Sequence, residues 1–257
     1  MSREKELDYF VAEFGWGRGI AWYEQQFASA KVRGEASPRY TMYPLYAGIP
    51  ERAARLVPDA RLIYMVREPV SRTVSHYFHA SVHASEDRSI GQALAIPTHN
   101  EYVLPSLYHT QLQQWLRFFP RDQFLVIAAE DLYRDRAATL QRVFRFLAVE
   151  ESFSSPRFWL THHRSDLQRQ RTMLGQRAAP RVSKLLRRLP PEVRGYAEWL
   201  FFYPLSKRVS APVLPPKVRR DLVHVLRPEI EAMIADWGVG ATWLPELIQA
   251  DANRGVE

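Results

Sequence analysis

The sequence predicts an α/β fold whose central, mainly parallel sheet is flanked by helices. Two apolar runs, Leu62–Val66 and Phe124–Ala128, have the length of strands. They lack the alternation of a half-exposed strand, which is typical of parallel strands that are buried on both faces. Segments with apolar residues at helical spacing lie on either side of these runs. Strands that alternate with helices in this way predict a parallel sheet, because each parallel connection needs a crossover.

Glycine and proline positions divide the chain into its elements. Glycines at 15, 17 and 19 interrupt the first segment, so we expect a helix only over residues 20–27. Residues 31–44 predict a short strand with a turn at Ser37-Pro38, and residues 50–56 predict a helix that Pro50 begins. The remaining expected helices cover residues 70–78, 104–119 and 137–147, and a pair that bends at Pro228 within Pro216–Trp237.

Length, charge and composition limit the classes of function. The 257 residues suffice for one large domain, which we expect over 1–247 with a polar tail over 248–257. A net charge of +7 favours anionic partners such as nucleotides and acidic glycans. The absence of cysteine excludes disulfides and thiolate metal sites and fits a reducing compartment, so we expect a cytoplasmic protein. No run reaches the roughly 18 apolar residues of a membrane span, and the charged N-terminus does not resemble a signal peptide.

The stretch that follows the first apolar run predicts an anion pocket. Arg67 stands at the end of the strand, Pro69 suits the first turn of a helix, and Arg72 and Ser75 follow on that helix. Ligands of open α/β sheets collect beyond the carboxyl ends of the strands, where a helix N-terminus offers free backbone N–H groups. The spacing alone leaves open whether the arginines bind a phosphate or are solvated surface charges.

The residues Arg67, Pro69, Arg72, Ser75 and Tyr77 resemble the 3′-phosphate-binding motif of sulfotransferases that use 3′-phosphoadenosine 5′-phosphosulfate (PAPS). The resemblance implies that Arg67 and Ser75 hold the 3′-phosphate of the donor nucleotide, with Arg72 as a further candidate. It also implies a sulfotransferase fold related to that of P-loop NTPases, and PAPS as the sulfate donor. The family needs no metal ion. We expect none here, although His79 and His83 lie four residues apart.

A second segment resembles carbohydrate sulfotransferases, in which K-E-x-H-F-F is followed by G-x-x-W-Y. Glu6 matches the glutamate that acts there as catalytic base, and Asp8 replaces the usual histidine. A carboxylate suits this role because an attacking hydroxyl must lose its proton as the new S–O bond forms. From the residues alone, the favoured interpretation is that Glu6 is one of several exposed acids near the terminus, beside Glu4 and Asp8.

Two further candidates lie in the segment G-E-x-S-P-x-Y, which lines the acceptor side of the cleft in the family. Glu35 and Arg39 are therefore candidates for binding the acceptor, although an acid beside a turn is often a local cap. The arginine-rich segment 162–188 is where we expect the basic loop that closes over the nucleotide. A solvated basic helix face explains the same residues equally well.

One departure from the family concerns the first strand and the loop that grips the 5′-phosphosulfate. In the family they precede the K-E-x-H-F-F piece, and no K-x-G-T-T or similar string occurs in this sequence. We expect transfer of a sulfuryl group from PAPS to a hydroxyl or amine of an acceptor, with carbohydrate as the favoured class of acceptor, and we expect no nucleic acid partner. Two alternatives stay open: a truncated, catalytically impaired nucleotide-binding protein, and a basic module that binds nucleic acid or acidic glycans.

Overall fold

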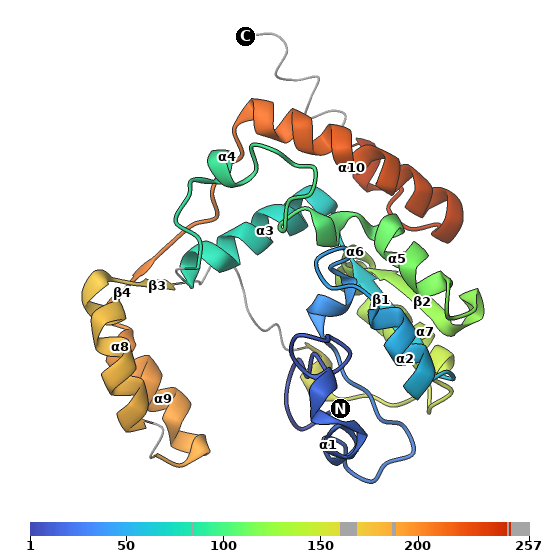
Figure 1. Cartoon of the computed structure of the whole chain (residues 1–257), viewed down its shortest axis with the longest axis horizontal. Coiled ribbons are helices and arrows are strands. Elements are labelled where there is room, and N and C mark those ends of the chain that lie inside the picture. Colours follow the sequence, from blue (N-terminus) through green and yellow to red (C-terminus); the bar gives the residue numbers. More distant parts are fainter. Residues whose placement is uncertain (84, 160–168, 187–188, 246, 248–257) are drawn as a thin grey trace. The chain divides into compact units, whose positions relative to one another are not determined.

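The computed structural model describes residues 1–257 apart from 84, 160–168, 187–188, 246 and 248–257 (Figure 1). The described part is mostly helical and contains two small sheets. Its residue contacts separate two compact units. The first unit comprises Met1–Thr73, Leu94–Phe153 and Pro216–Glu257, and the second comprises Val74–Ala93 and Ser154–Pro215.

The sheet of the first unit consists of β1 (Leu62–Val66) and β2 (Phe124–Ala128), which pair in parallel from Leu62↔Phe124 to Val66↔Ala128 (Figure 1). Both predicted strands are thus confirmed at their bounds. The expectation that both are buried on two faces was wrong for β1. Ile63 is 40% exposed and Met65 is 54% exposed; the two side chains share one face of β1, and both line a cavity of the first unit.

Helices surround this sheet in the first unit. Their bounds are Ile20–Gln25 (α1), Ile49–Leu56 (α2), Pro69–Val82 (α3, which continues into the second unit), Tyr108–Leu116 (α5), Ala129–Arg134 (α6), Arg136–Leu147 (α7) and Pro216–Trp237 (α10). Helix α10 packs beside α5 (Figure 1). The Glu229 carboxylate of α10 accepts the N–H (2.8 Å) and hydroxyl (2.5 Å) of Thr110, which satisfies donors in the first turn of α5.

Three expected elements differ in the structure. Helix α10 continues through Pro228 as one helix. Of its residues expected to face inward, Trp237 is half-buried and the others are buried: Leu222, Leu226, Ile230 and Met233. The expected helix 104–119 is split at Leu107, whose ψ of 67° is not helical, into a 3-10 turn and α5. Residues 31–44 form no strand. They contain a 3-10 turn, Pro38–Thr41, because local side chains rather than a neighbouring strand hold this segment.

The second unit contains the remaining elements. Their bounds are Ile90–Ala93 (α4), Pro156–Trp159 (a 3-10 turn), Arg169–Arg171 (β3), Met173–Leu186 (α8), Pro191–Phe202 (α9) and Ser206–Arg208 (β4). Strands β3 and β4 pair antiparallel. The arginine-rich segment 162–188 therefore lies partly in β3 and α8, whereas its residues 162–168 and 187–188 fall outside the described residues.

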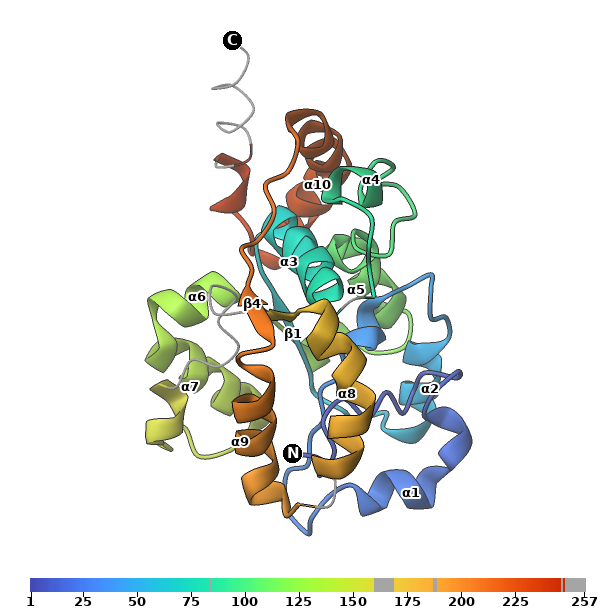
Figure 2. The same ribbon diagram turned by 90° about the vertical axis from the view of Figure 1, so that its left-hand side faces the viewer.

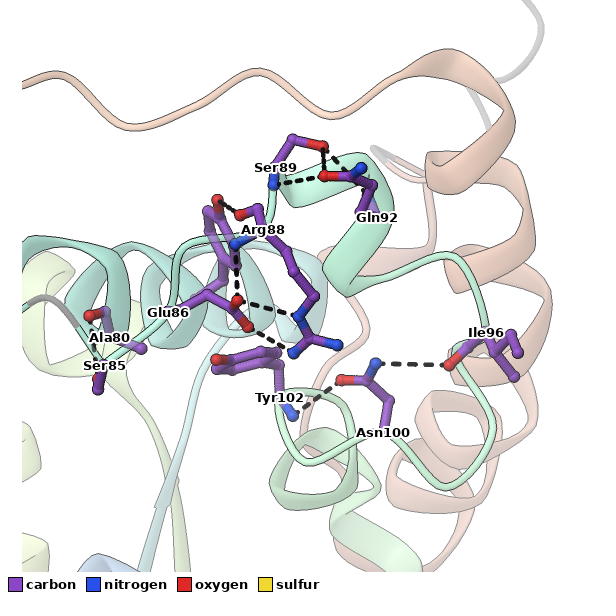
Figure 3. Close-up of polar contacts among 10 residues, drawn as sticks. Ala80, Ser85, Glu86, Arg88, Ser89, Gln92, Ile96, Asn100 and Tyr102 are labelled. Atoms are coloured by element: carbon purple, nitrogen blue, oxygen red, sulfur yellow. Dashed lines mark hydrogen bonds and ion pairs between the residues drawn. The ribbon is translucent and has the colours of Figure 1, made fainter.

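The segment after α3 is held by an ion pair within the second unit (Figure 3). Arg88 contacts both oxygens of the buried Glu86 carboxylate at 2.9 and 2.5 Å, and the hydroxyl of Tyr77 donates to the Arg88 carbonyl at 2.7 Å. These residues border a cavity of about 530 Å³. Among the described helices of the chain, none has the length and hydropathy needed to cross a bilayer.

Candidate active site

A cavity of about 1310 Å³ lies in the first unit along β1. One part of its lining is cationic and includes Arg67 and Arg72, together with the phenols of Tyr64 and Tyr108. Another part carries a carboxylate among hydroxyls, contributed by residues that precede α2: Tyr23, Glu35, Ser37 and Tyr40. A large cavity with a few convergent polar groups is the usual form of a small-molecule site.

Arg67 directly follows the carboxyl end of β1, and its backbone is fixed from α5. The Tyr108 hydroxyl donates to the Arg67 carbonyl at 2.9 Å and accepts the Arg67 N–H at 3.4 Å. The guanidinium donates to the Ser71 carbonyl in the first turn of α3 at 3.0 Å. Arg67 is half-buried and lines the cavity, so the structure places this predicted residue at the expected edge of the sheet.

The N-terminus of α3 differs from the expectation of free backbone N–H groups. The Glu68 carboxylate accepts the N–H of Val70 at 2.8 Å and of Ser71 at 2.7 Å. The Glu68 N–H in turn donates to Glu130, which follows β2, at 2.8 Å. A carboxylate is favourable here because it satisfies unpaired donors and faces the positive end of the helix dipole. Two of the N–H groups that we expected to meet phosphate are therefore already occupied.

Arg72 lies deeper in the same part of the cavity. Its guanidinium donates to the Tyr102 carbonyl at 3.1 Å. Burial lowers the pKa of Arg72, the phenols of Tyr108 and Tyr64 oppose this, and the charge of Arg67 adds to the lowering. Burial also raises the pKa of Tyr108 to about 12, so its hydroxyl stays protonated near neutral pH. Arg67 and Arg72 bring two positive charges to the lining of this cavity, which favours an anionic ligand.

Ser75, the other predicted phosphate ligand, lies in the second turn of α3. It is half-buried and belongs to the part of the helix assigned to the second unit. The residues that line the cavity of the first unit do not include it. Its role therefore rests on the motif.

Glu35 lines the cavity, and its carboxylate is the centre of a hydrogen-bond network. Its Oε1 accepts the hydroxyls of Tyr23 and Tyr40, both at 3.0 Å, and its Oε2 accepts the hydroxyl of Ser37 at 3.2 Å. Burial raises the pKa of Glu35, and these three hydrogen bonds oppose the shift. Glu35 thus has the location that the sequence predicts, but its described bonds organise the wall of the cavity.

Arg39 and Asp8 form an ion pair next to this wall. Arg39 donates to Asp8 Oδ2, and its guanidinium lies 4.8 Å from the centre of the Phe14 ring. Asp8 is only 7% exposed, and its Oδ1 is buried without a hydrogen-bond partner in the described structure. Burial raises the pKa of Asp8, and the attraction of Arg39 opposes this shift. The Asp8 N–H donates to Ser37 at 3.0 Å, which links the pair to the Glu35 network.

Glu6, the predicted catalytic base, has an exposed side chain that lies 3.3 Å from Lys5 Nζ. It is not among the residues that line the cavity. Its φ of 56° and that of Asp8, 47°, are both left-handed. The chain direction therefore changes sharply on either side of Leu7, and the carboxylates of Glu6 and Asp8 have different surroundings: one is exposed and the other is buried.

Several residues of the site were missed by the sequence interpretation. Tyr108 falls within the expected helix 104–119 and belongs to no motif, and Asp8 was noted only as a departure from the family motif. Tyr23 and Tyr40 end the G-x-x-W-Y and G-E-x-S-P-x-Y segments, but only the fold shows that their hydroxyls meet Glu35. The described residues contain no group of three or more histidine or acidic side chains arranged to hold a metal ion.

Comparisons with known proteins identify related sequences. Residues 4–176 match the family model described as the sulfotransferase domain. Human heparan sulfate glucosamine 3-O-sulfotransferase 5 is 27% identical over 163 residues, which are 58% of this chain and 46% of that protein. Human heparan sulfate glucosamine 3-O-sulfotransferase 6 is 30% identical over 152 residues, 55% of this chain and 43% of that protein. The chain thus spans less than half the length of these relatives.

A solved structure shows the same fold. The crystal structure of a sulfotransferase from Alicyclobacillus acidocaldarius matches with a TM-score of 0.60 and 20% identity, over 91% of this chain and 83% of that one. The family model covers residues 4–176, a range that contains β1 and Arg67. This chain belongs to the sulfotransferase domain family.

Proposed function

We propose that this chain binds PAPS and transfers its sulfuryl group to a hydroxyl or amine of a carbohydrate acceptor. The observation that carries the proposal is the position of Arg67 at the carboxyl end of β1, where it lines a cavity of about 1310 Å³ together with Arg72. The family supports PAPS as donor, and the glucosamine sulfotransferases among the relatives support a carbohydrate acceptor.

In this proposal Arg67 and Ser75 hold the 3′-phosphate, as their match to the family motif implies, and Arg72 adds positive charge from the cavity floor. The cavity residues fit such a ligand, because two cations and several phenols can meet a phosphate and an adenine ring. PAPS supplies an activated sulfuryl group whose leaving group is adenosine 3′,5′-bisphosphate. The chain's own residues bind and orient it.

The acceptor is proposed to lie against the wall formed by Glu35, Ser37 and Tyr40, with Arg39 beside it. A bond forms from sulfur to the acceptor oxygen or nitrogen while the S–O bond to the 5′-phosphate breaks. The proton of the acceptor passes to a carboxylate. We assign this role to Glu6 on its match to the family motif.

The first experiment is a calorimetric titration with adenosine 3′,5′-bisphosphate, combined with thermal unfolding. A ligand that binds the native state raises the melting temperature, and we expect Arg67→Ala to remove the effect. Arg55→Ala is the matched control, because Arg55 is an exposed arginine of α2 paired with Glu51. An unchanged melting temperature at saturating nucleotide contradicts the proposed site.

Two further measurements separate the alternatives. A transfer assay with PAPS and glucosamine-containing polysaccharides distinguishes an enzyme from a protein that binds the nucleotide without transfer. A module for nucleic acid predicts binding that weakens steeply with salt and does not respond to the bisphosphate.

A further inference from the structure

Helix α9 of the second unit exposes an apolar stripe. Tyr196 is 67% exposed, Leu200 is 58% exposed and Trp199 is 54% exposed. With Val193 and Tyr203 they recur at the spacing of one helix face. The side chain of Phe202, on a different face of the helix, is buried. Helix α9 therefore has apolar surface well beyond the face that packs inward.

Aromatic rings form a continuous row in this stripe. The ring centres of Tyr196 and Trp199 are 6.0 Å apart, and those of Trp199 and Tyr203 are 5.0 Å apart. Tyrosine and tryptophan combine an apolar body with a polar edge, so they prefer an environment that is apolar on one side and wet on the other. Such residues are enriched at the boundary between lipid and water.

The neighbouring helix α8 exposes a row of cations. Arg177, Arg181 and Lys184 are exposed and lie four and three residues apart, so they share one face of α8. Helices α8 and α9 run side by side (Figure 2). Among the residues of α8 and α9 whose burial the structure describes, the acidic one is Glu198, and it is only half-exposed. The hairpin therefore combines an aromatic and aliphatic stripe with a cationic one.

We propose that the α8–α9 hairpin binds the surface of an anionic lipid bilayer. The stripe of α9 enters the boundary between headgroups and acyl chains, and the cations of α8 contact the lipid phosphates. Charge complementarity favours an anionic partner. The aliphatic members Val193 and Leu200 favour lipid over an acidic polysaccharide, because sugars offer no acyl phase to cover them. This binding needs no nucleotide and is independent of the proposed transfer reaction.

Sedimentation of the full chain with vesicles tests the proposal. Vesicles of phosphatidylcholine alone are compared with vesicles that also contain phosphatidylglycerol, without nucleotide. We expect the chain to bind the anionic vesicles at least about tenfold more tightly, since each cation near such a surface contributes to binding. Replacing the α8 cations should remove most of this preference. The variant is Arg177→Gln/Arg181→Gln/Lys184→Gln, and its charge-matched control replaces exposed arginines of the first unit: Arg117→Gln/Arg142→Gln/Arg220→Gln.

The apolar stripe has its own variant and control. Trp199→Ser/Leu200→Ser should weaken vesicle binding about tenfold or more, because it removes two side chains that enter the lipid boundary. Val213→Ser/Ile96→Ser removes two side chains that are 81% and 71% exposed elsewhere, and should leave vesicle binding unchanged. Circular dichroism and melting temperatures confirm that each variant is folded.

Three results overturn the proposal. The first is equal sedimentation of the wild type and the Trp199→Ser/Leu200→Ser variant. The second is equal binding of the wild type to neutral and anionic vesicles. The third is a combination of two results: the wild type binds no vesicles, and analytical ultracentrifugation shows that it is a dimer that the Trp199→Ser/Leu200→Ser variant does not form. The partner of the stripe is then a second copy of the chain. A titration with adenosine 3′,5′-bisphosphate on the same variants reports separately on the nucleotide site.

Discussion

The hydroxyl of Tyr108 holds the backbone of Arg67 on both sides, because it donates to the carbonyl at 2.9 Å and accepts the N–H at 3.4 Å. Tyr108 is 3% exposed and belongs to α5, whereas Arg67 directly follows β1. The direction in which the Arg67 side chain leaves the strand thus depends on a helix about 40 residues further along the chain. We regard Tyr108 as a positioning residue for the proposed phosphate ligand.

We predict that Tyr108→Phe weakens binding of adenosine 3′,5′-bisphosphate about fivefold to tenfold, as expected for the loss of about 1 kcal/mol of hydrogen bonding. The ring and its packing remain, so the fold should persist. Calorimetric titration measures the affinity. The control is Thr139→Val, which removes a buried hydroxyl that donates to the Asp135 carbonyl at 2.7 Å in α7, away from the cavity. Equal losses of affinity in both variants count against a positioning role.

Glu68→Gln should have opposite effects on stability and on nucleotide affinity. The carboxylate caps the N–H groups of Val70 and Ser71, so its loss should lower the free energy of unfolding by about 1 kcal/mol. Removing a negative charge beside Arg67 should strengthen binding of the bisphosphate severalfold. Asp135→Asn is the matched control, because Asp135 caps α7 through the N–H of Ala138. That variant should lose stability without any gain in affinity, as measured by urea unfolding and calorimetry.

The sequence predicted the framework of the site because its signals there are local. Both strands were expected at their bounds, since an apolar run that ends at Arg67 or Ala129 needs only neighbouring residues to be recognised. The turn at Pro69 follows from the fixed φ of proline. The resemblance to sulfotransferases depended on the same short strings.

Contacts between distant segments could not be predicted in this way. Glu35 receives hydroxyls from Tyr23 and Tyr40, and which side chains meet in a fold is not encoded in spacing. The exposure of Met65 has a similar origin, because it depends on which distant segments cover its face of β1. The local sequence was enough to predict that Glu68 caps the N-terminus of α3, since an acid directly before a helix is a common cap.

The Glu35 network predicts a dependence of stability on pH. Burial raises the pKa of Glu35 above its ordinary value of 4.5. The folded state therefore binds more protons than the unfolded state in this window, and stability declines as the pH rises through the raised pKa. We predict that the melting temperature of Glu35→Gln rises relative to that of the wild type as the pH increases from about 5 to about 8. Glu51→Gln, at an exposed carboxylate of α2, is the control. If the difference in melting temperature between the wild type and Glu35→Gln is constant with pH, the raised pKa of Glu35 is contradicted.

We predict opposite effects on catalysis and stability for substitutions of Glu6 and Asp8. Glu6 is exposed beside Lys5, so Glu6→Gln should leave the melting temperature and nucleotide affinity unchanged. If its carboxylate accepts the acceptor proton, kcat should fall about 100-fold or more. Asp8 is buried and paired with Arg39, so Asp8→Asn should lower the free energy of unfolding by about 1–3 kcal/mol.

A transfer assay with PAPS, run beside thermal unfolding of both variants, separates the two roles. The assignment of Glu6 is wrong if Glu6→Gln retains full transfer while a folded Asp8→Asn loses it. The base is then the buried carboxylate, whose pKa is already raised toward the range in which it can take up a proton. The exposed Glu6 then acts only as a surface charge. Because neither Glu6 nor Asp8 lines the cavity that Arg67 lines, this pair of variants tests the catalytic role without substituting a residue of that lining.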